Sequence, residues 1–119
     1  MKQYMLSVHM VEGEPQPPED EIQQMYKDVD VVNAEMQRAG AWVFGGGLHA
    51  AETATVVKVS DGEVVTTDGP FAETKEQLGG YYLIDVANLD DAVHWAARCP
   101  SAVGGSIEVR PLGHMVAAH

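Results

Sequence analysis

One segment of the chain, TTDGPFAETKEQLGGYY, limits the folds that the sequence allows more than any other; it spans residues 66–82. Gly69 tolerates a positive φ, and the ring of Pro70 pushes it away from the helical region, so a sharp bend is expected after a strand. We expect the Asp68 carboxylate to accept backbone N–H groups of this bend and Phe71 to anchor it through an apolar contact. The segment is either a well-specified connection between two strands or a rigid loop that holds Asp68 at the mouth of a pocket.

The remainder of this segment carries further local signals. Thr74 and Gln77 have the spacing of a capping box, which predicts a single helical turn. The pair Gly79 and Gly80 would end this turn, and a buried strand is expected over residues 81–86.

The rest of the chain shows clear periodicity. Alternating apolar residues predict strands over residues 3–9, 41–48, 53–60, 63–67 and 106–110. Helical spacing predicts a long helix that starts at Pro18 and ends before Gly40, and a shorter helix that is capped by Asn88 and ended by Pro100. The glycine run 45–47 has no following Gly-Lys-Ser/Thr and no helix, so it indicates a bulge or a close backbone approach rather than a phosphate loop.

The order strand, helix, strand, hairpin, strand, helix, strand predicts one α+β domain over residues 1–119. With the hairpin turning at Asp61-Gly62 as an insertion, the arrangement is a ferredoxin-like split βαβ fold. Residues 112–119 are expected to form a loosely ordered tail. Two helices can cover one face of the sheet, yet residues of both faces are apolar, so we expect a homodimer in which two sheets pack face to face into an α+β barrel.

Composition excludes several classes of protein. The 119 residues are 45% apolar, which is typical of a folded chain, and they carry a net charge of −11. Seven dispersed basic residues against eighteen acidic ones disfavour nucleic-acid binding. No apolar run approaches a membrane span, no secretory signal opens the chain, and the single cysteine, Cys99, is compatible with the cytoplasm.

Three segments resemble a known family: VTTDGPFAETKEQLGGYYLIDV, NLDDAVHWAARCP and GGSIEVRPL. Together they are similar to the DGPF-domain branch of the YCII-related family. The resemblance implies a ferredoxin-like α+β unit that dimerises into a barrel, and genes placed beside those of extracytoplasmic-function sigma factors. It also implies that some relatives are small lyase-type enzymes with a His–Asp pair, the Asp preceding a proline after the second helix. Here Cys99 precedes Pro100 and the long helix contains no histidine, so this pair is not present.

The candidate catalytic residues are Asp68, His9 and His49, because each is expected at the end of a strand where a cavity can open. A histidine there can exchange a proton near neutral pH; alternatively, both are surface histidines satisfied by solvent. Ser7, on the same strand face as His9, and Phe71 are the candidate ligand contacts. No His or Cys spacing indicates a metal site, and no cofactor is expected.

Two functions remain open. The first is a dimeric small-molecule-binding or accessory module with a link to a sigma factor. The second is an acid–base enzyme that acts on a small polar organic substrate through Asp68 with His9, His49 or both. The missing His–Asp pair favours the first.

Overall fold

A computed structural model describes residues 2–11, 17–102 and 105–113 of the chain. Its elements, in chain order, are β1 (Lys2–Val11), α1 (Glu19–Arg38), β2 (Trp42–Gly47), the 3-10 helix η1 (Ala51–Thr53), β3 (Thr55–Ser60), β4 (Glu63–Asp68), β5 (Glu76–Val86), α2 (Leu89–Arg98), the 3-10 helix η2 (Pro100–Ala102) and β6 (Ser106–Pro111). Most of the tail predicted over residues 112–119 lies outside the described residues, as does most of the loop before Pro18.

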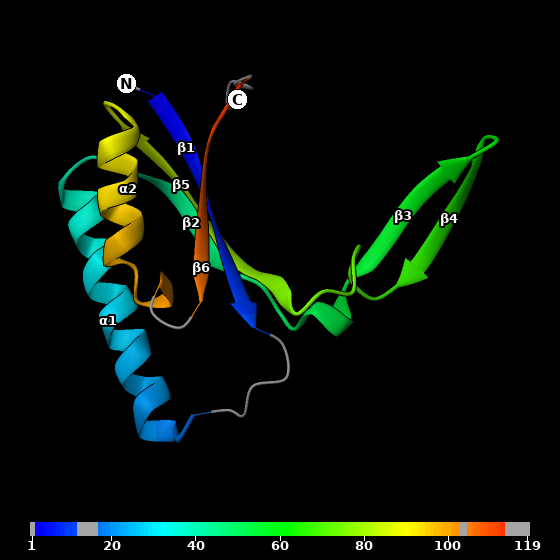
Figure 1. The fold of residues 1–119 in the computed structure, drawn as a ribbon, viewed down its shortest axis with the longest axis horizontal. Coiled ribbons are helices and arrows are strands. Elements are labelled where there is room, and N and C mark those ends of the chain that lie inside the picture. Colours follow the sequence, from blue (N-terminus) through cyan, green and yellow to red (C-terminus); the bar gives the residue numbers. More distant parts are fainter. Residues whose placement is uncertain (1, 12–16, 103–104, 114–119) are drawn as a thin grey trace.

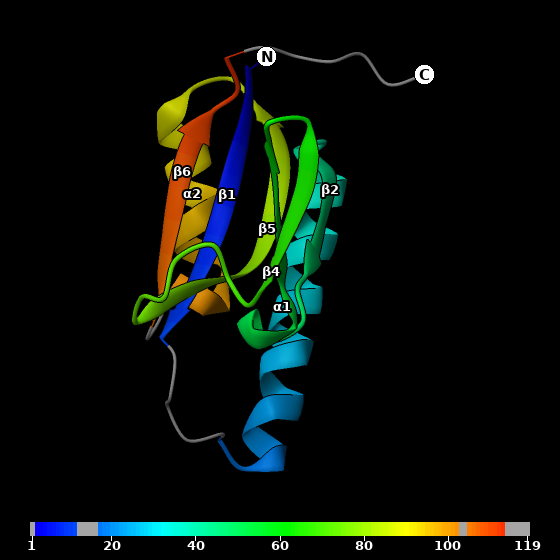
Figure 2. The same ribbon diagram turned by 90° about the vertical axis from the view of Figure 1, so that its right-hand side faces the viewer.

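Four strands form one sheet in the order β2-β5-β1-β6, and every neighbouring pair is antiparallel. Both helices cover one face of this sheet, and the other face carries no helix (Figures 1 and 2). Strands β3 and β4 pair with each other in a separate two-stranded sheet. The result is a mixed α+β fold that is compatible with the predicted ferredoxin-like arrangement with an inserted hairpin.

The core lies between the four-stranded sheet and the helices. Tyr4, Leu6 and Val8 alternate along β1 and are buried, and Tyr4 and Leu6 belong to one cluster with Val32 and Met36 of α1. Burial of such side chains stabilises the fold by about 1.5 to 3 kcal/mol each. The other buried core residues come from the residue before β2, from β5, and from α2 with the residue after it: Ala41, Ile84, Val86, Ala92, Ala96 and Cys99. Neither described helix is both long and apolar enough to cross a membrane.

Local backbone signals behave as predicted. Gly40 follows α1 with a φ of 73°, which an L side chain rarely adopts, and so ends the helix. The hairpin between β3 and β4 turns at Asp61 and Gly62, both with positive φ. Asn88 caps α2, since its Oδ1 accepts the Asp91 backbone N–H at 3.0 Å.

The prediction of a helical turn at Thr74 and Gln77 is wrong. β5 already begins at Glu76 and continues through the Gly79–Gly80 pair, where the sequence predicts the end of the turn. Gln77 Nε2 instead donates to the Ala72 carbonyl oxygen at 2.7 Å. The strand forms here because β5 pairs with the whole length of β1, and this long ladder outweighs one local capping signal.

The bend after β4 also differs from its prediction. Gly69 has the expected positive φ of 98°. However, no hydrogen bond to the Asp68 carboxylate is found among the described residues, and the bend is held by the Gly69 N–H, which donates to the Ala54 carbonyl oxygen at 2.8 Å. Phe71 is 90% exposed, so within this chain it does not anchor the bend.

The glycine run of β2 has the predicted role. The register of β2 shifts between Trp42 and Phe44, so the bulge lies before the glycines, and it is the close backbone approach that the glycine run provides. A Cβ on Gly80 of β5 would lie 3.0 Å from the Gly46 carbonyl oxygen. A Cβ on Gly45 would lie 2.8 Å from the Tyr81 carbonyl oxygen. Strands β2 and β5 therefore approach each other closely at Gly45 and Gly80, where a side chain would press on the backbone of the neighbouring strand.

The hairpin of β3 and β4, here called the arm, projects away from the sheet on the side opposite the helices (Figure 1). Val59 and Val64 are paired and lie on one face of the arm together with Val57. They are 65% and 68% exposed, and Val57 is 61% exposed. An isolated two-stranded hairpin is marginally stable in water, so this apolar face lacks the cover that a strand pair normally needs.

Candidate functional site

A cavity of about 480 Å³ opens at the base of the arm. Four parts of the chain meet there: the end of β1, the segment from Leu48 through η1, the loop after β4, and the start of β5. The residues that line it are His9, Leu48, His49, Ala50, Ala51, Thr53, Ala54, Pro70, Phe71, Ala72, Thr74, Glu76, Gln77 and Leu78. A volume of this size is typical of small-molecule sites.

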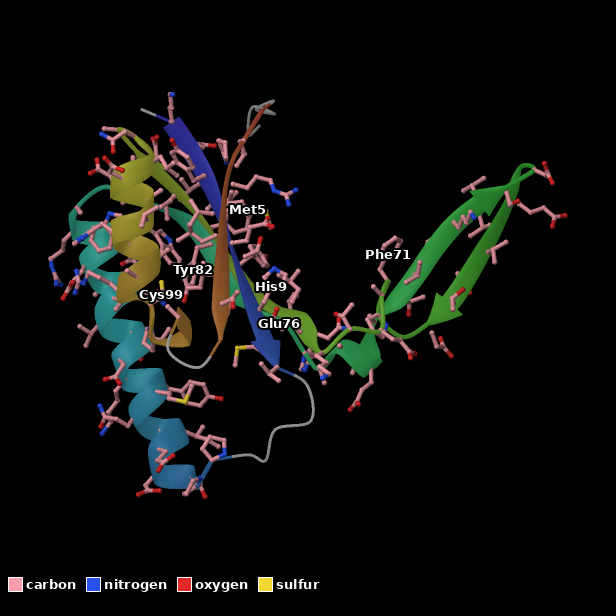
Figure 3. All side chains as sticks on the ribbon, in the orientation of Figure 1. Met5, His9, Phe71, Glu76, Tyr82 and Cys99 are labelled. Carbon is pink, nitrogen blue, oxygen red and sulfur yellow. The ribbon has the colours of Figure 1, made fainter. Side chains whose placement is uncertain are left out.

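Both candidate histidines line this cavity. His9 follows a register shift in β1 and is half-buried. Figure 3 shows His9 and Met5 on the side of the sheet away from the helices. His49 is exposed and directly follows Leu48. The Leu48 N–H donates to the Gly79 carbonyl oxygen at 2.9 Å, and this bond holds the segment of His49 against β5. His9 and His49, which are forty positions apart in the chain, therefore line the same cavity.

Glu76 is the ionisable residue of this cavity that the sequence did not single out. Its Oε1 accepts a hydrogen bond from Ser106 Oγ at 3.4 Å. Because Ser106 is the direct partner of His9 in β6, and β1 lies between β6 and β5, this bond bridges β1 beside His9. His9 and Glu76 both line the cavity. A prediction that β5 starts at Glu76 would have identified this residue as a candidate. The capping-box pattern predicts a helical turn there instead.

The remaining candidate site residues differ in whether they line the cavity. Phe71 lines the cavity, and its nearly complete exposure leaves the ring free to contact a ligand or another chain. Asp68 is exposed at the end of β4 and is not among the lining residues. Ser7 is also absent from the lining and is buried between its partners Tyr81 and Glu108. The structure therefore brings together His9, His49 and Phe71, and leaves Asp68 and Ser7 apart from them.

The cavity combines apolar walls with a few polar groups. Alanines, leucines and a proline supply most of the lining, and the imidazoles and the Glu76 carboxylate supply hydrogen-bonding and proton-exchanging groups. Within the described part of the chain, no group of three or more His, Cys, Asp or Glu residues lies close enough to hold a metal ion. The arrangement is suited to hold a small organic molecule with an apolar body and one or two polar groups.

Residues 3–116 match the family model of the YCII-related domain. The chain belongs to the YCII-related family. An uncharacterised protein of Rhizobium meliloti (strain 1021), R00369, is 41% identical to this YCII-related protein over 95 residues, which cover 78% of this chain and 77% of the relative.

Cys99 of this YCII-related protein occupies the position before Pro100 and is buried, with 2% exposure. Its Sγ donates to the Trp95 carbonyl oxygen at 3.4 Å. Burial raises the pKa of the Cys99 thiol from 9.0 to about 11, and the Arg98 guanidinium opposes this only in part. The thiol is therefore protonated near neutral pH, which fits a small core residue rather than a nucleophile.

The buried thiol predicts a loss of stability in alkaline solution. Since the pKa of Cys99 is higher in the folded chain than its ordinary value of 9.0, the folded state keeps the proton between pH 9 and 11 while the unfolded chain loses it. This contribution to the free energy of unfolding is fully present below pH 9, and about 2 to 3 kcal/mol of it is lost by pH 11. Denaturant melts of the unmodified chain and of Cys99→Ala should diverge by this amount over that range. If the free energies of unfolding of the two proteins change in parallel between pH 9 and 11, the raised pKa of Cys99 is contradicted.

Proposed function

We propose that this protein is a dimeric small-molecule-binding module of the DGPF branch of its family. The observation that carries the proposal is the cavity at the base of the arm, which His9, His49 and Glu76 all line. Two imidazoles and one carboxylate provide both donors and acceptors, and the apolar walls bury the rest of a ligand. The ligand class that fits is a small organic molecule with an apolar body and a polar group directed at His9 and His49.

The dimer is supported by surface that a single chain leaves uncovered. The chain exposes 8619 Å², whereas a compact protein of 12.8 kDa exposes about 6,300 Å². Phe44, which contacts the ring of Tyr81, and Phe71 are exposed aromatic residues, and the valine face of the arm is apolar. A second copy is the partner that supplies a matching apolar surface for all of them.

In the proposed dimer, the helix-free faces of two sheets pack together into an α+β barrel and each arm lies on the other chain. The interface should bury more than about 1,500 Å² and be largely apolar. Sedimentation of the unmodified chain at micromolar concentration should therefore give twice the mass of one chain, at low and at high salt. A monomer at these concentrations would contradict the proposal.

We further propose that ligand binding serves a regulatory or accessory role connected with an extracytoplasmic-function sigma factor. This part rests on the resemblance of the DGPFAETKE segment alone. The free, buried thiol of Cys99 is compatible with a reducing compartment, so we assign the function to the cytoplasm.

An acid–base enzyme is the second candidate, and the presence of His9 and Glu76 in the lining of one cavity favours it. A carboxylate beside an imidazole can orient it or exchange a proton with it. In this version Glu76 takes the role that the sequence suggests for Asp68, since Asp68 does not line the cavity. Turnover of a bound compound that disappears in Glu76→Gln, while binding persists, would identify an enzyme; binding without turnover supports the module.

Substitution of either cavity histidine should weaken ligand binding. In a nuclear magnetic resonance screen of small organic fragments, compounds that bind are expected to shift the ring signals of His9 and His49 together. His9→Gln and His49→Gln should each lower the affinity of such compounds about tenfold, because each removes one hydrogen bond to a polar group of the ligand.

His94→Gln is the matched control. His94 is exposed on α2, where it contacts the Trp95 ring, and it does not line the cavity. Its substitution should leave the affinities unchanged. Equal losses in all three variants, or bound fragments that shift neither cavity histidine, would contradict the proposed site.

A further inference from the structure

The cavity at the base of the arm is not enclosed within one chain. None of its described lining residues is buried, and most of them, such as Leu48, His49 and Phe71, are exposed. Small-molecule sites in proteins usually cover about 70 to 90% of the surface of a ligand. One chain therefore supplies a floor and a rim, and another surface is needed to close the site.

The floor of the cavity belongs to the helix-free face of the four-stranded sheet. Figure 3 shows His9 on this side. Leu78 is the direct partner of His9 in β5, and it lies on the same face because paired residues of antiparallel strands point the same way. Glu76 pairs with Val11, two positions after His9, so Glu76 also belongs to this face. A molecule that covers this end of the helix-free face therefore also covers the cavity.

Apolar side chains continue from this floor along the same face. Met5 and Leu83 are direct partners, and Leu83 also pairs with Phe44 of β2. The ring of Phe44, which is 47% exposed, meets the Tyr81 ring edge to face, with centroids 5.6 Å apart. The surface on which we place the second sheet of the dimer is thus continuous with the floor of the cavity.

The size of a dimer interface decides whether a second copy reaches the cavity. A standard interface takes about 800 Å² from each chain, which corresponds to a patch about 30 Å across. His9 lies four residues from Met5 along β1, a distance of about 13 Å. A second copy centred on Met5 therefore extends to His9. The exposed charges of β6 on this face, Glu108 and Arg110, pair with each other at 2.8 Å and so neutralise each other against a second copy.

We propose that a second copy of the chain closes the cavity at the base of the arm, so that the ligand is held between two chains and binds the dimer more tightly than the single chain. The inference rests on the proposed function and adds to it a coupling between ligand binding and dimerisation. Covering about 60 Å² more of the apolar surface of a ligand raises its affinity about tenfold. Because a symmetric dimer has two such cavities, saturation with ligand should tighten the dimer about hundredfold.

2-Naphthol is the probe, since it has a flat apolar body and one hydroxyl that can both donate to and accept from an imidazole. Calorimetric titration compares the unmodified chain with the variant Val59→Glu, Val64→Glu, in which two carboxylates on the arm should keep the chain monomeric. These valines do not line the cavity, so the variant keeps every lining residue. It should bind 2-naphthol about tenfold more weakly than the unmodified dimer. Lys58→Glu, also on the arm and outside the cavity, should remain a dimer and keep the affinity of the unmodified chain.

Sedimentation velocity of the unmodified chain tests the same coupling without any variant. Saturating 2-naphthol should lower the dissociation constant of the dimer about hundredfold. Equal affinities of dimer and monomer for 2-naphthol, or a dimer dissociation constant that 2-naphthol leaves unchanged although it binds, would overturn the inference and leave the proposed ligand site standing. If 2-naphthol does not bind the unmodified chain, the proposed ligand site fails, and the inference fails with it.

Discussion

The double variant Val59→Glu, Val64→Glu is expected to be monomeric at concentrations at which the unmodified chain sediments as a dimer. These valines are directly paired on one face of the arm and are more than half exposed in the single chain. In the proposed dimer the second copy covers them, so each new carboxylate would be buried without a partner at a cost of several kcal/mol. Sedimentation velocity over a concentration series measures the shift in the dimer dissociation constant.

Lys58→Glu is the matched control for this experiment. Lys58 lies between Val57 and Val59 along β3 and therefore projects from the opposite face of the arm. Its substitution changes the net charge by −2, as the double variant does, so it separates charge repulsion from lost apolar contact. The control should remain a dimer. If the double variant still dimerises as the unmodified chain does, the valine face of the arm is not part of the interface.

Gly45→Ala should destabilise the fold by about 3 kcal/mol. A Cβ at this position would lie 2.7 Å from Tyr82 Cδ1 and 2.8 Å from the Tyr81 carbonyl oxygen. The Tyr82 ring can rotate, but the carbonyl oxygen belongs to the backbone of β5, so the strands must separate. Denaturant melts of the variant and the unmodified chain measure the difference in the free energy of unfolding.

Gly46→Ala is the control for the effect of alanine in this strand. The nearest atom to a Cβ there is Tyr81 Oη at 4.0 Å, which leaves room for a methyl group. Alanine also restricts the unfolded chain more than glycine does, so the free energy of unfolding should change by less than about 1 kcal/mol and can rise. Similar losses in both variants would show that loss of glycine, rather than the close approach of β5, causes the destabilisation.

The elements that the sequence predicted correctly are those set by nearby residues. The end of α1 at Gly40, the turn at Asp61 and Gly62, and the capping of α2 by Asn88 each depend on a few adjacent φ angles or on one short hydrogen bond. The inward direction of Tyr4 and Leu6 follows from the alternation of side chains along a strand. These preferences act within one or two turns of chain, so they are visible in the sequence.

The segment from Thr74 to Gln77 shows the opposite case. Its residues have the spacing of a helix cap, but no helical turn forms. Glu76 and Gln77 are the first residues of β5, because they pair with Val11 and Met10 of β1. Those partners are more than sixty positions away in the chain. The energy of the ladder depends on the position of β1 in the sheet, and a local pattern contains no information about it.

The candidate site depends both on features that nearby residues set and on features that distant contacts set. The sequence by itself determined that His9 and His49 lie near the ends of strands, that Gly69 bends the chain with a positive φ, and that the fold is α+β, since these depend on local backbone preferences and on the period of apolar residues. The tertiary structure alone decided that Glu76, and not Asp68, lines the same cavity as the two histidines, and that the arm leaves the sheet with its valines uncovered. The physical reason is that strand register and the direction of the arm come from contacts between distant segments, and these contacts choose among the arrangements that local preferences leave equal.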